Sequence, residues 1–133
     1  LYSGYSKKAD FPGQKQKVKI SKYLTKYVKA GELALEVGCG YGDNLAYLAN
    51  KGVRVVGIDK ETGNDYADYK PERKLDMIYA IHLLEHLSDP RGFIVWMLRN
   101  LTDTGRFVLE IPCLDDPLLK LYDSKAYKKF CWY

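Results

Sequence analysis

Hydrophobic and polar positions follow two different periods along this chain. Short apolar runs of strand length occupy residues 33–37, 53–58, 76–80 and 106–111. Between them, apolar residues recur at spacings of three and four, as on one face of a helix. Strands that alternate with helices are typical of a parallel sheet with right-handed connections. The pattern therefore predicts an α/β fold with a doubly wound, mostly parallel sheet.

The helical segments have recognisable starts and buried faces. Proline is favoured at the first helical position, so Ser88-Asp89-Pro90 is expected to open a helix. That helix is expected to bury Phe93, Trp96, Met97 and Leu101. The expected helices are residues 14–30, a helix that starts near Asp43, a short helix or turn at 82–87, the helix that starts at Pro90, and the tail at 118–130.

Length and composition fit one ordinary domain. The chain has 133 residues, of which 47% are hydrophobic and 29% charged, and residues 1–13 are expected to form an N-terminal arm. No apolar run approaches the roughly 20 residues of a membrane span, and no secretory signal is recognised. Three widely spaced cysteines suggest neither a disulfide framework nor a zinc site, which predicts a reducing, cytoplasmic location.

The basic residues allow two interpretations. The net charge is +4, and lysines gather near both ends of the chain. They could meet an anionic partner such as nucleic acid or a nucleotide-linked sugar, or they could form the solvated faces of two amphipathic helices. The modest total charge favours the second interpretation, so nucleic acid is not an expected partner.

A glycine-rich segment follows the first predicted strand, and an acid follows the second. Gly38, Gly40 and Gly42 are spaced as G-x-G-x-G just before a predicted helix, and Asp59 ends the run at 53–58. Glycines let the backbone turn sharply and bring a ligand close to main-chain amides. A helix N-terminus adds positive potential, and a carboxylate after the second strand can accept hydrogen bonds from both ribose hydroxyls. The arrangement predicts a nucleotide-cofactor loop.

The spacing and charge of this loop indicate which cofactor it binds. The dinucleotide fingerprint G-x-G-x-x-G would need a third glycine where the chain has Asp43. Glu36, two residues before the first glycine, would repel a pyrophosphate. The ammonium group and cationic sulfur of S-adenosylmethionine suit a carboxylate there. The loop therefore favours S-adenosylmethionine, with NAD as the alternative.

Four segments of the chain resemble, in the same order, the motifs of class I S-adenosylmethionine-dependent methyltransferases. Residues 35–42 (LEVGCGYG) resemble motif I, and residues 55–59 (VVGID) resemble the motif after it. Residues 75–87 (LDMIYAIHLLEHL) resemble the segment around strand four, with its Leu-Glu-His-Leu block. Residues 105–112 (GRFVLEIP) resemble the strand-five motif. The resemblance spans about residues 14–115 and implies a Rossmann-like fold and methyltransferase activity.

The resemblance also implies roles for residues around the cofactor. Residues 38–40 of the glycine loop would line the methionine moiety, Asp59 would bind the ribose, and Lys60 would lie beside adenine. Backbone groups after the strand at 76–80 would meet the amino end of the cofactor, with help from Glu36. The implied cofactor-binding residues are Glu36, Gly38, Cys39, Gly40, Asp59, Lys60, Ala80 and Ile81.

Three chemistries fit the segment that holds both histidines. His82, Glu85 and His86 have the H-x-x-E-H spacing of inverted zinc proteases, but the methyltransferase pattern already accounts for this segment. The resemblance to ubiquinone-type O-methyltransferases implies a divalent metal at matching positions, although histidine at the first of them departs from that pattern. Alternatively, His82 or His86 is a general base. We expect catalytic histidines and no metal.

The chain departs from the family pattern in two places. Only 16 residues separate Asp59 from Asp76, too few for a crossover helix and a further strand, so Asp65 is the candidate for the adenine-contacting acid. The 22 residues after Ile111 lack the pattern of the family's last two strands. We expect a sheet that is incomplete at its C-terminal edge, where an exposed strand allows a homodimer.

The sequence therefore predicts a single methyltransferase domain, residues 1–133, that moves a methyl group from S-adenosylmethionine to a small-molecule acceptor. A sugar or glycan precursor is the preferred acceptor, by analogy within the family. Neither a membrane nor nucleic acid is expected as a partner. The alternatives are a non-catalytic S-adenosylmethionine-binding module and an NAD-dependent oxidoreductase.

Overall fold

The structure is a computed structural model that describes residues 22–112. Its four strands are β1 (Leu33–Val37), β2 (Arg54–Ile58), β3 (Leu75–Ile81) and β4 (Leu101–Glu110). They form one sheet in the order β2-β1-β3-β4, in which every neighbouring pair is parallel. The predicted parallel sheet is confirmed, and β4 is an edge strand of the described sheet.

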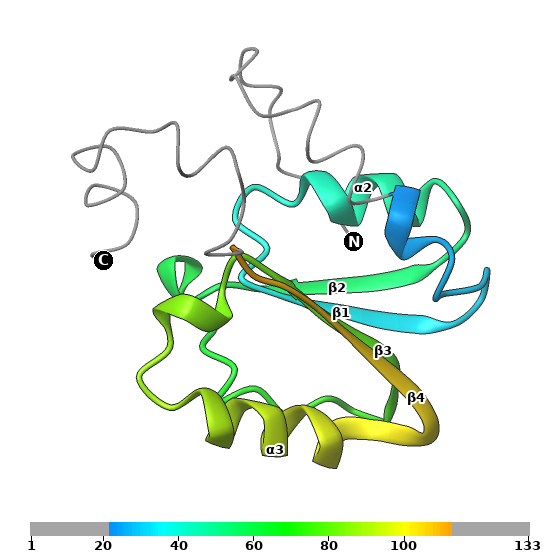
Figure 1. Cartoon of the computed structure of the whole chain (residues 1–133). Helices are drawn as coiled ribbons and strands as arrows, with labels where there is room; N and C mark the ends of the chain where they lie inside the picture. The colour runs from blue at the N-terminus through cyan, green and yellow to red at the C-terminus, as the bar shows by residue number, and fades with distance from the viewer. Residues whose placement is uncertain (1–21, 113–133) are drawn as a thin grey trace.

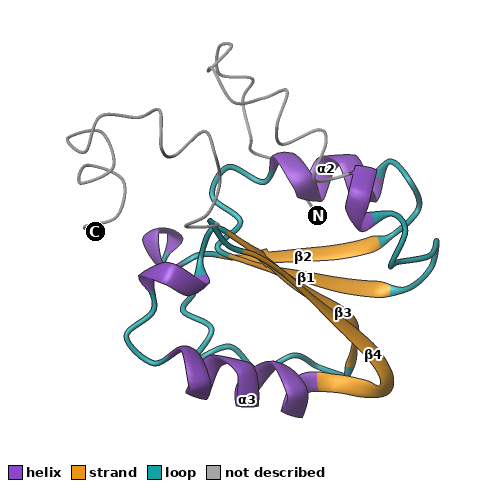
Figure 2. Cartoon of the chain, in the orientation of Figure 1, coloured by secondary structure: helices purple, strands orange, loops and turns teal. Residues whose placement is uncertain are grey.

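Helices cover both faces of the sheet (Figures 1 and 2). α2 (Asp43–Ala49) lies on one face and α3 (Pro90–Asn100) on the other. Two short 3₁₀ helices, η1 (Lys60–Thr62) and η2 (Leu84–His86), follow the ends of β2 and β3. Since all four strands are parallel, the loops after β1, β2 and β3 gather at one edge of the sheet. None of the helices within residues 22–112 is long and apolar enough to cross a membrane.

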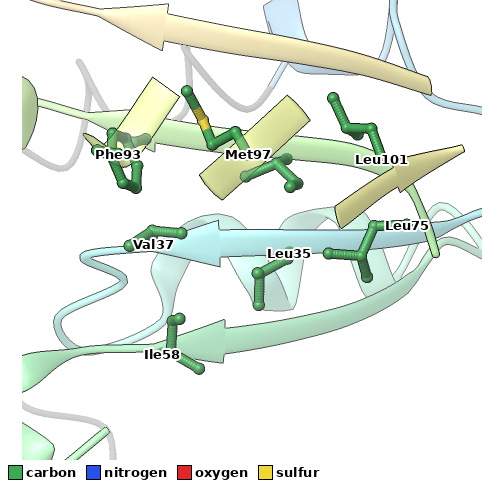
Figure 3. Packing of buried hydrophobic residues seen from close by; sticks show 9 residues of the cluster. Leu35, Val37, Ile58, Leu75, Phe93, Met97 and Leu101 are labelled. Carbon is green, nitrogen blue, oxygen red and sulfur yellow. The ribbon is translucent and has the colours of Figure 1, made fainter. Parts of the chain in front are cut away.

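Alternating side chains divide the core between the two faces. Leu35 and Val37 of β1 point toward α3, where they pack with Phe93 and Met97 (Figure 3). All four are at most 4% exposed. The cluster on the α2 face consists of Leu24, Val28, Ala34, Leu48, Val53, Met77 and Tyr79. Burial on both faces explains why β1 and β3 are almost continuously apolar in sequence.

α3 begins as the sequence predicts. The Asp89 side chain accepts a hydrogen bond from the Gly92 amide at 2.9 Å, and Pro90 occupies the first helical position. This cap satisfies one of the amides that a helix start leaves without an intrahelical partner. Phe93 and Met97 are fully buried, and Trp96 packs partly buried against the same cluster. The prediction that this helix buries Phe93, Trp96 and Met97 is confirmed, but it is wrong for Leu101, which is buried as the first residue of β4.

The first predicted helix ends earlier than expected. Residues 22–24 are helical, but residues 25–27 form a turn, so the prediction that the helix reaches residue 30 is wrong. The Tyr27 amide donates to the Leu24 carbonyl, and the Thr25 hydroxyl donates to the Lys22 carbonyl. These contacts tighten the last turn and compete with continued helix. Residues 14–21 of that helix, the arm at 1–13 and the tail at 118–130 lie outside the described residues.

β4 begins five residues before the predicted start at residue 106. Leu101 pairs with Leu75 and Arg106 with Met77, so five residues of β4 advance while β3 advances two. The extra residues form an irregularity in the strand rather than a separate connection. Gly105 lies there because a Cβ at this position would come within 3.0 Å of the Leu75 carbonyl oxygen.

Candidate functional site

The glycine loop leaves β1 in a conformation that requires glycine. Gly38, Gly40 and Gly42 have φ values of 76°, 50° and 78°, in the left-handed region that other residues rarely adopt. The amides of Gly38 and Cys39 both donate to the Ile58 carbonyl, at 2.8 and 3.2 Å, which fixes the loop across the end of β2. A Cβ at Gly40 would meet no atom within 4 Å, so this part of the loop is open to a ligand.

Asp59 joins the end of β2 to the glycine loop. One carboxylate oxygen accepts the Gly40 amide at 2.8 Å, and the other accepts the Glu61 amide at 2.9 Å. A carboxylate offers about four acceptor positions, so each oxygen can accept a further hydrogen bond. Next to it, the Lys60 ammonium is 87% exposed and lies 3.8 Å from the Asp65 carboxylate. The geometry suits a ligand with two neighbouring hydroxyls.

Glu36 lies beneath the loop, on the α2 face of the sheet. It is 2% exposed, and its two oxygens accept from the Asn44 side-chain amide at 2.8 Å and the Tyr79 hydroxyl at 3.2 Å. These contacts tie β1 to the first turn of α2 and to β3. A buried carboxylate is stable only with such partners. Glu36 therefore holds together β1, α2 and β3, which support the loop, and it places a carboxylate below the loop.

The surroundings of Cys39 in the loop raise the pKa of its thiol. Burial raises the pKa of its thiol to about 11, and the carboxylates of Glu36 and Asp59 add to the rise. Burial, the larger cause, disfavours any charge, whereas the contribution of the two carboxylates disfavours an anion and favours a cation near the loop. The Cys39 side chain packs beside Gly57 of β2, where a Cβ would lie 2.8 Å from the sulfur and 2.4 Å from Leu45. Gly57 thus makes room for the loop.

The end of β3 lies beside the glycine loop. Ala80 pairs in register with Val37, the last residue of β1, and is buried, whereas Ile81 is partly buried. His82 follows with a φ of 52°, an uncommon value for a residue with a side chain. Its amide donates to the Glu110 carbonyl at 2.9 Å, which holds the turn against the end of β4.

Carboxylates surround the two histidines. His82 Nε2 lies 3.2 Å from a Glu110 oxygen, and its Nδ1 lies 3.5 Å from a Glu85 oxygen. His86 Nε2 lies 4.0 Å from the same Glu85 oxygen. In the part of the chain that the structure describes, no three His, Cys, Asp or Glu side chains are arranged to bind a metal ion. The cluster has the groups needed to accept and stabilise a proton.

The predicted site residues therefore fall into two neighbouring groups. The glycine loop and Asp59 are in direct contact, and Ala80 to His82 lie beside them at the end of β3. Glu36 lies below this surface rather than on it. The sequence analysis missed the supporting residues, which are Asn44, Gly57, Tyr79 and Glu110. Gly57 carried a signal, because a glycine inside a β-branched strand marks a close approach.

The chain matches the protein family described as "Methyltransferase domain" over residues 14–132. It therefore belongs to this family. No curated protein matches the chain.

Solved structures share the fold at low sequence identity. Coclaurine N-methyltransferase, bound to N-methylheliamine and SAH, has a TM-score of 0.62 and 18% identity over 79% of this chain and 38% of that one. The plantazolicin methyltransferase BpumL, in complex with a pentazolic desmethylPZN analog and SAH, has a TM-score of 0.65 and 16% identity over 90% and 55%. A SAM-bound amino pentose methyltransferase from Micromonospora echinaspora, involved in calicheamicin biosynthesis, has a TM-score of 0.57 and 16% identity over 80% and 53%. The chain thus spans about half or less of the length of these structures.

Proposed function

We propose that this chain binds S-adenosylmethionine and transfers its methyl group to a small-molecule acceptor. The observation that carries the proposal is the Asp59 carboxylate. It holds the Gly40 amide of the open loop and retains acceptor positions for the two hydroxyls of a ribose. Family membership supports the same conclusion.

The charge around the loop favours S-adenosylmethionine over a dinucleotide. Besides burial, Glu36 and Asp59 raise the pKa of the Cys39 thiol, and the same two carboxylates would disfavour the pyrophosphate of NAD. A ligand with a sulfonium and an ammonium group is attracted by the same two carboxylates. Gly38, Cys39 and Gly40 would line its methionine part, and Lys60 would lie beside adenine. The backbone of Ala80 and Ile81 would meet its amino end.

The residues at the end of β3 suit the reaction itself. S-adenosylmethionine supplies a methyl group on a cationic sulfur, and much of the rate of such a transfer comes from alignment with the nucleophile. When the nucleophile is a hydroxyl, its proton has to leave as the new bond forms. His82 and His86 are the proposed catalytic residues because they follow β3, whose end lies beside the loop, and have carboxylate oxygens of Glu85 and Glu110 at 3.2–4.0 Å.

A sugar or glycan precursor is the acceptor that we propose for the first assays. The fold that the chain shares with an amino pentose methyltransferase supports this choice. We also propose a cytoplasmic location and a homodimer that forms through the edge of β4. Asp65 is the acid that we propose contacts adenine.

The test is methyl transfer from S-adenosylmethionine with a labelled methyl group to a panel of methyl glycosides, amino sugars and catechols. The proposal expects a labelled product with at least one acceptor. Asp59→Asn should weaken S-adenosylhomocysteine binding at least tenfold, because the ribose hydroxyls would no longer donate to a charged carboxylate. Asp103→Asn, an exposed acid of β4 before Gly105, is the matched control and should bind like the unmodified chain. Binding without transfer to any acceptor would favour a non-catalytic cofactor-binding module.

A further inference from the structure

The connection between β2 and β3 is held against α3 by aromatic rings. The Tyr66 ring meets Phe93 edge-on at a centroid distance of 4.8 Å and meets Trp96 at 5.5 Å. Phe93 is fully buried, and its ring is nearly parallel to that of Trp96. Edge-to-face packing is the favourable arrangement of such rings. Tyr66 thereby joins this connection to the core of the domain.

Contacts within the first part of the same connection fix its conformation. The Asp59 carbonyl accepts hydrogen bonds from the amides of Thr62 and Asn64, both at 3.1 Å. The Asp65 carboxylate accepts the Ala67 amide at 3.1 Å and lies 3.8 Å from the Lys60 ammonium. Residues 59–67 therefore form one small unit, which we call the ribose-side segment. Within the described residues, no strand or long helix lies in this connection to support it.

Two attachments determine where the ribose-side segment lies. At one end, Asp59 continues from β2 and holds the Gly40 amide. At the other end, the Tyr66 ring packs against α3. Tyr69 also packs against this core, but it lies beyond the segment. If the Tyr66 ring contact is lost, the segment itself is attached through β2, and Asp59 and Lys60 have more freedom to turn relative to the glycine loop.

We propose that Tyr66 is a positioning residue for the nucleoside half of the bound cofactor. This inference rests on the proposed function, because it assumes that Asp59 and Lys60 meet a ribose and an adenine. Tyr66 acts through the placement of these two residues rather than by contact with the methyl group. Burial and the nearby carboxylates of Asp65 and Asp89 raise the pKa of its phenol, so the hydroxyl carries no charge at neutral pH.

Adenosine and S-adenosylhomocysteine together separate this role from a general loss of structure. Adenosine contains only the nucleoside half, so a defect in the ribose-side segment should weaken both ligands by the same factor. A defect in the glycine loop should weaken S-adenosylhomocysteine more than adenosine. Gly38→Ala is the reference for the second pattern, because its Cβ would lie 3.1 Å from Leu83 at a φ of 76°.

The experiment is calorimetric titration of the full chain and its variants with adenosine and with S-adenosylhomocysteine. Tyr66→Ala should raise both dissociation constants about tenfold, whereas Tyr66→Phe, which keeps the ring, should stay within about twofold of the unmodified chain. Tyr23→Ala is the matched control. Tyr23 also packs edge-on, against Tyr27, but it lies outside the connection and should leave both constants unchanged.

A folded Tyr66→Ala variant that binds both ligands like the unmodified chain would overturn the inference. A folded variant that loses affinity for S-adenosylhomocysteine alone would overturn it too. If Tyr66→Ala does not fold, Trp96→Leu removes one of the two ring contacts and should weaken the binding of both ligands about threefold; unchanged binding would refute the inference.

Binding of adenosine but not of S-adenosylhomocysteine by the unmodified chain would reject the proposed function and leave the role of Tyr66 intact. Binding of neither ligand would reject both.

Discussion

Gly57 provides the sharpest structural prediction, because its substitution acts on the cofactor loop from below. A Cβ at this position of β2 would lie 2.4 Å from Leu45 Cδ1, 2.8 Å from the Cys39 sulfur and 3.0 Å from Cys39 Cβ. The φ of Gly57 is not in the left-handed region, so alanine is acceptable to the backbone. Gly57→Ala is therefore a steric perturbation of Leu45 and Cys39.

The expected loss of stability follows from two opposing terms. Replacing a glycine at a compatible position stabilises a protein by about 0.4–1 kcal/mol, because the unfolded chain has fewer conformations. Overpacking a buried site costs about 1–3 kcal/mol, and Leu45 is only 2% exposed. We expect a net loss of about 1–2 kcal/mol. Because Cys39 has to move with its loop, S-adenosylhomocysteine binding should weaken roughly tenfold.

Urea unfolding and calorimetric titration measure the two effects of Gly57→Ala. Gly31→Ala is the matched control, since its φ of 84° makes alanine strained by about 1 kcal/mol but no atom lies within 4 Å of the added Cβ. The control should lose similar stability and keep its affinity, because Gly31 lies before β1, at the opposite edge of the sheet. Leu45→Ala combined with Gly57→Ala should be less destabilising than the sum of the single changes by about 1 kcal/mol.

Additive effects of the Leu45 and Gly57 substitutions would refute the steric argument. So would a Gly57→Ala variant with unchanged stability and affinity, since that result would mean that the loop has room for the methyl group.

Three further predictions concern ionisable groups and backbone strain. Burial opposes the charge of Glu32, but the Lys29 amide and the Arg106 guanidinium outweigh it and hold the pKa of Glu32 below its ordinary value of 4.5. A lowered pKa means stability that is present above pH 4.5 and lost as the pH falls through the folded value, so the unmodified chain should lose more stability than Glu32→Gln between about pH 6 and pH 3 in urea unfolding; equal losses would contradict the ion pair's role. At the turn after β3, His82→Gly should be about 1 kcal/mol more stable than His82→Ala, because only alanine keeps the strain of a positive φ, and equal urea midpoints would argue against that strain. Finally, the pKa of Cys39 is raised to about 11 from an ordinary 9.0, mainly by burial and further by Glu36 and Asp59. It predicts that iodoacetamide labels Cys39 roughly 100-fold more slowly at pH 8 than an unhindered thiol, as followed by peptide mass spectrometry; labelling at the rate of a free thiol would contradict this account of its surroundings.

The sequence predicts the sheet well because burial on both faces leaves a strong local signal. The apolar runs in β1, β2 and β3 identify the strands to within a residue, and Asp89-Pro90 identifies the start of α3. The start of β4 is less accessible to prediction. Residues 102–105 are polar or glycine, as in a loop, and only the register against β3 makes them part of the strand.

The candidate site is predictable where its residues follow one another along the chain. The glycine loop and Asp59 come directly after strands, so their meeting follows from parallel pairing of β1 with β2. The contacts of Glu36 are harder to predict, because one of its partners lies far away along the chain. Tyr79 lies 43 residues away and reaches it because the side chains of β1 and β3 that point toward α2 share one face. Likewise, Glu110 meets His82 only because β4 pairs with β3.

The central claim is that the loop binds S-adenosylmethionine, and its most direct test is calorimetric titration of the full chain with S-adenosylhomocysteine and, separately, with NAD. The positions of the two carboxylates, Asp59 on the loop and Glu36 below it, predict saturable one-to-one binding of S-adenosylhomocysteine and at least tenfold weaker binding of NAD. Equal or tighter binding of NAD would contradict the account.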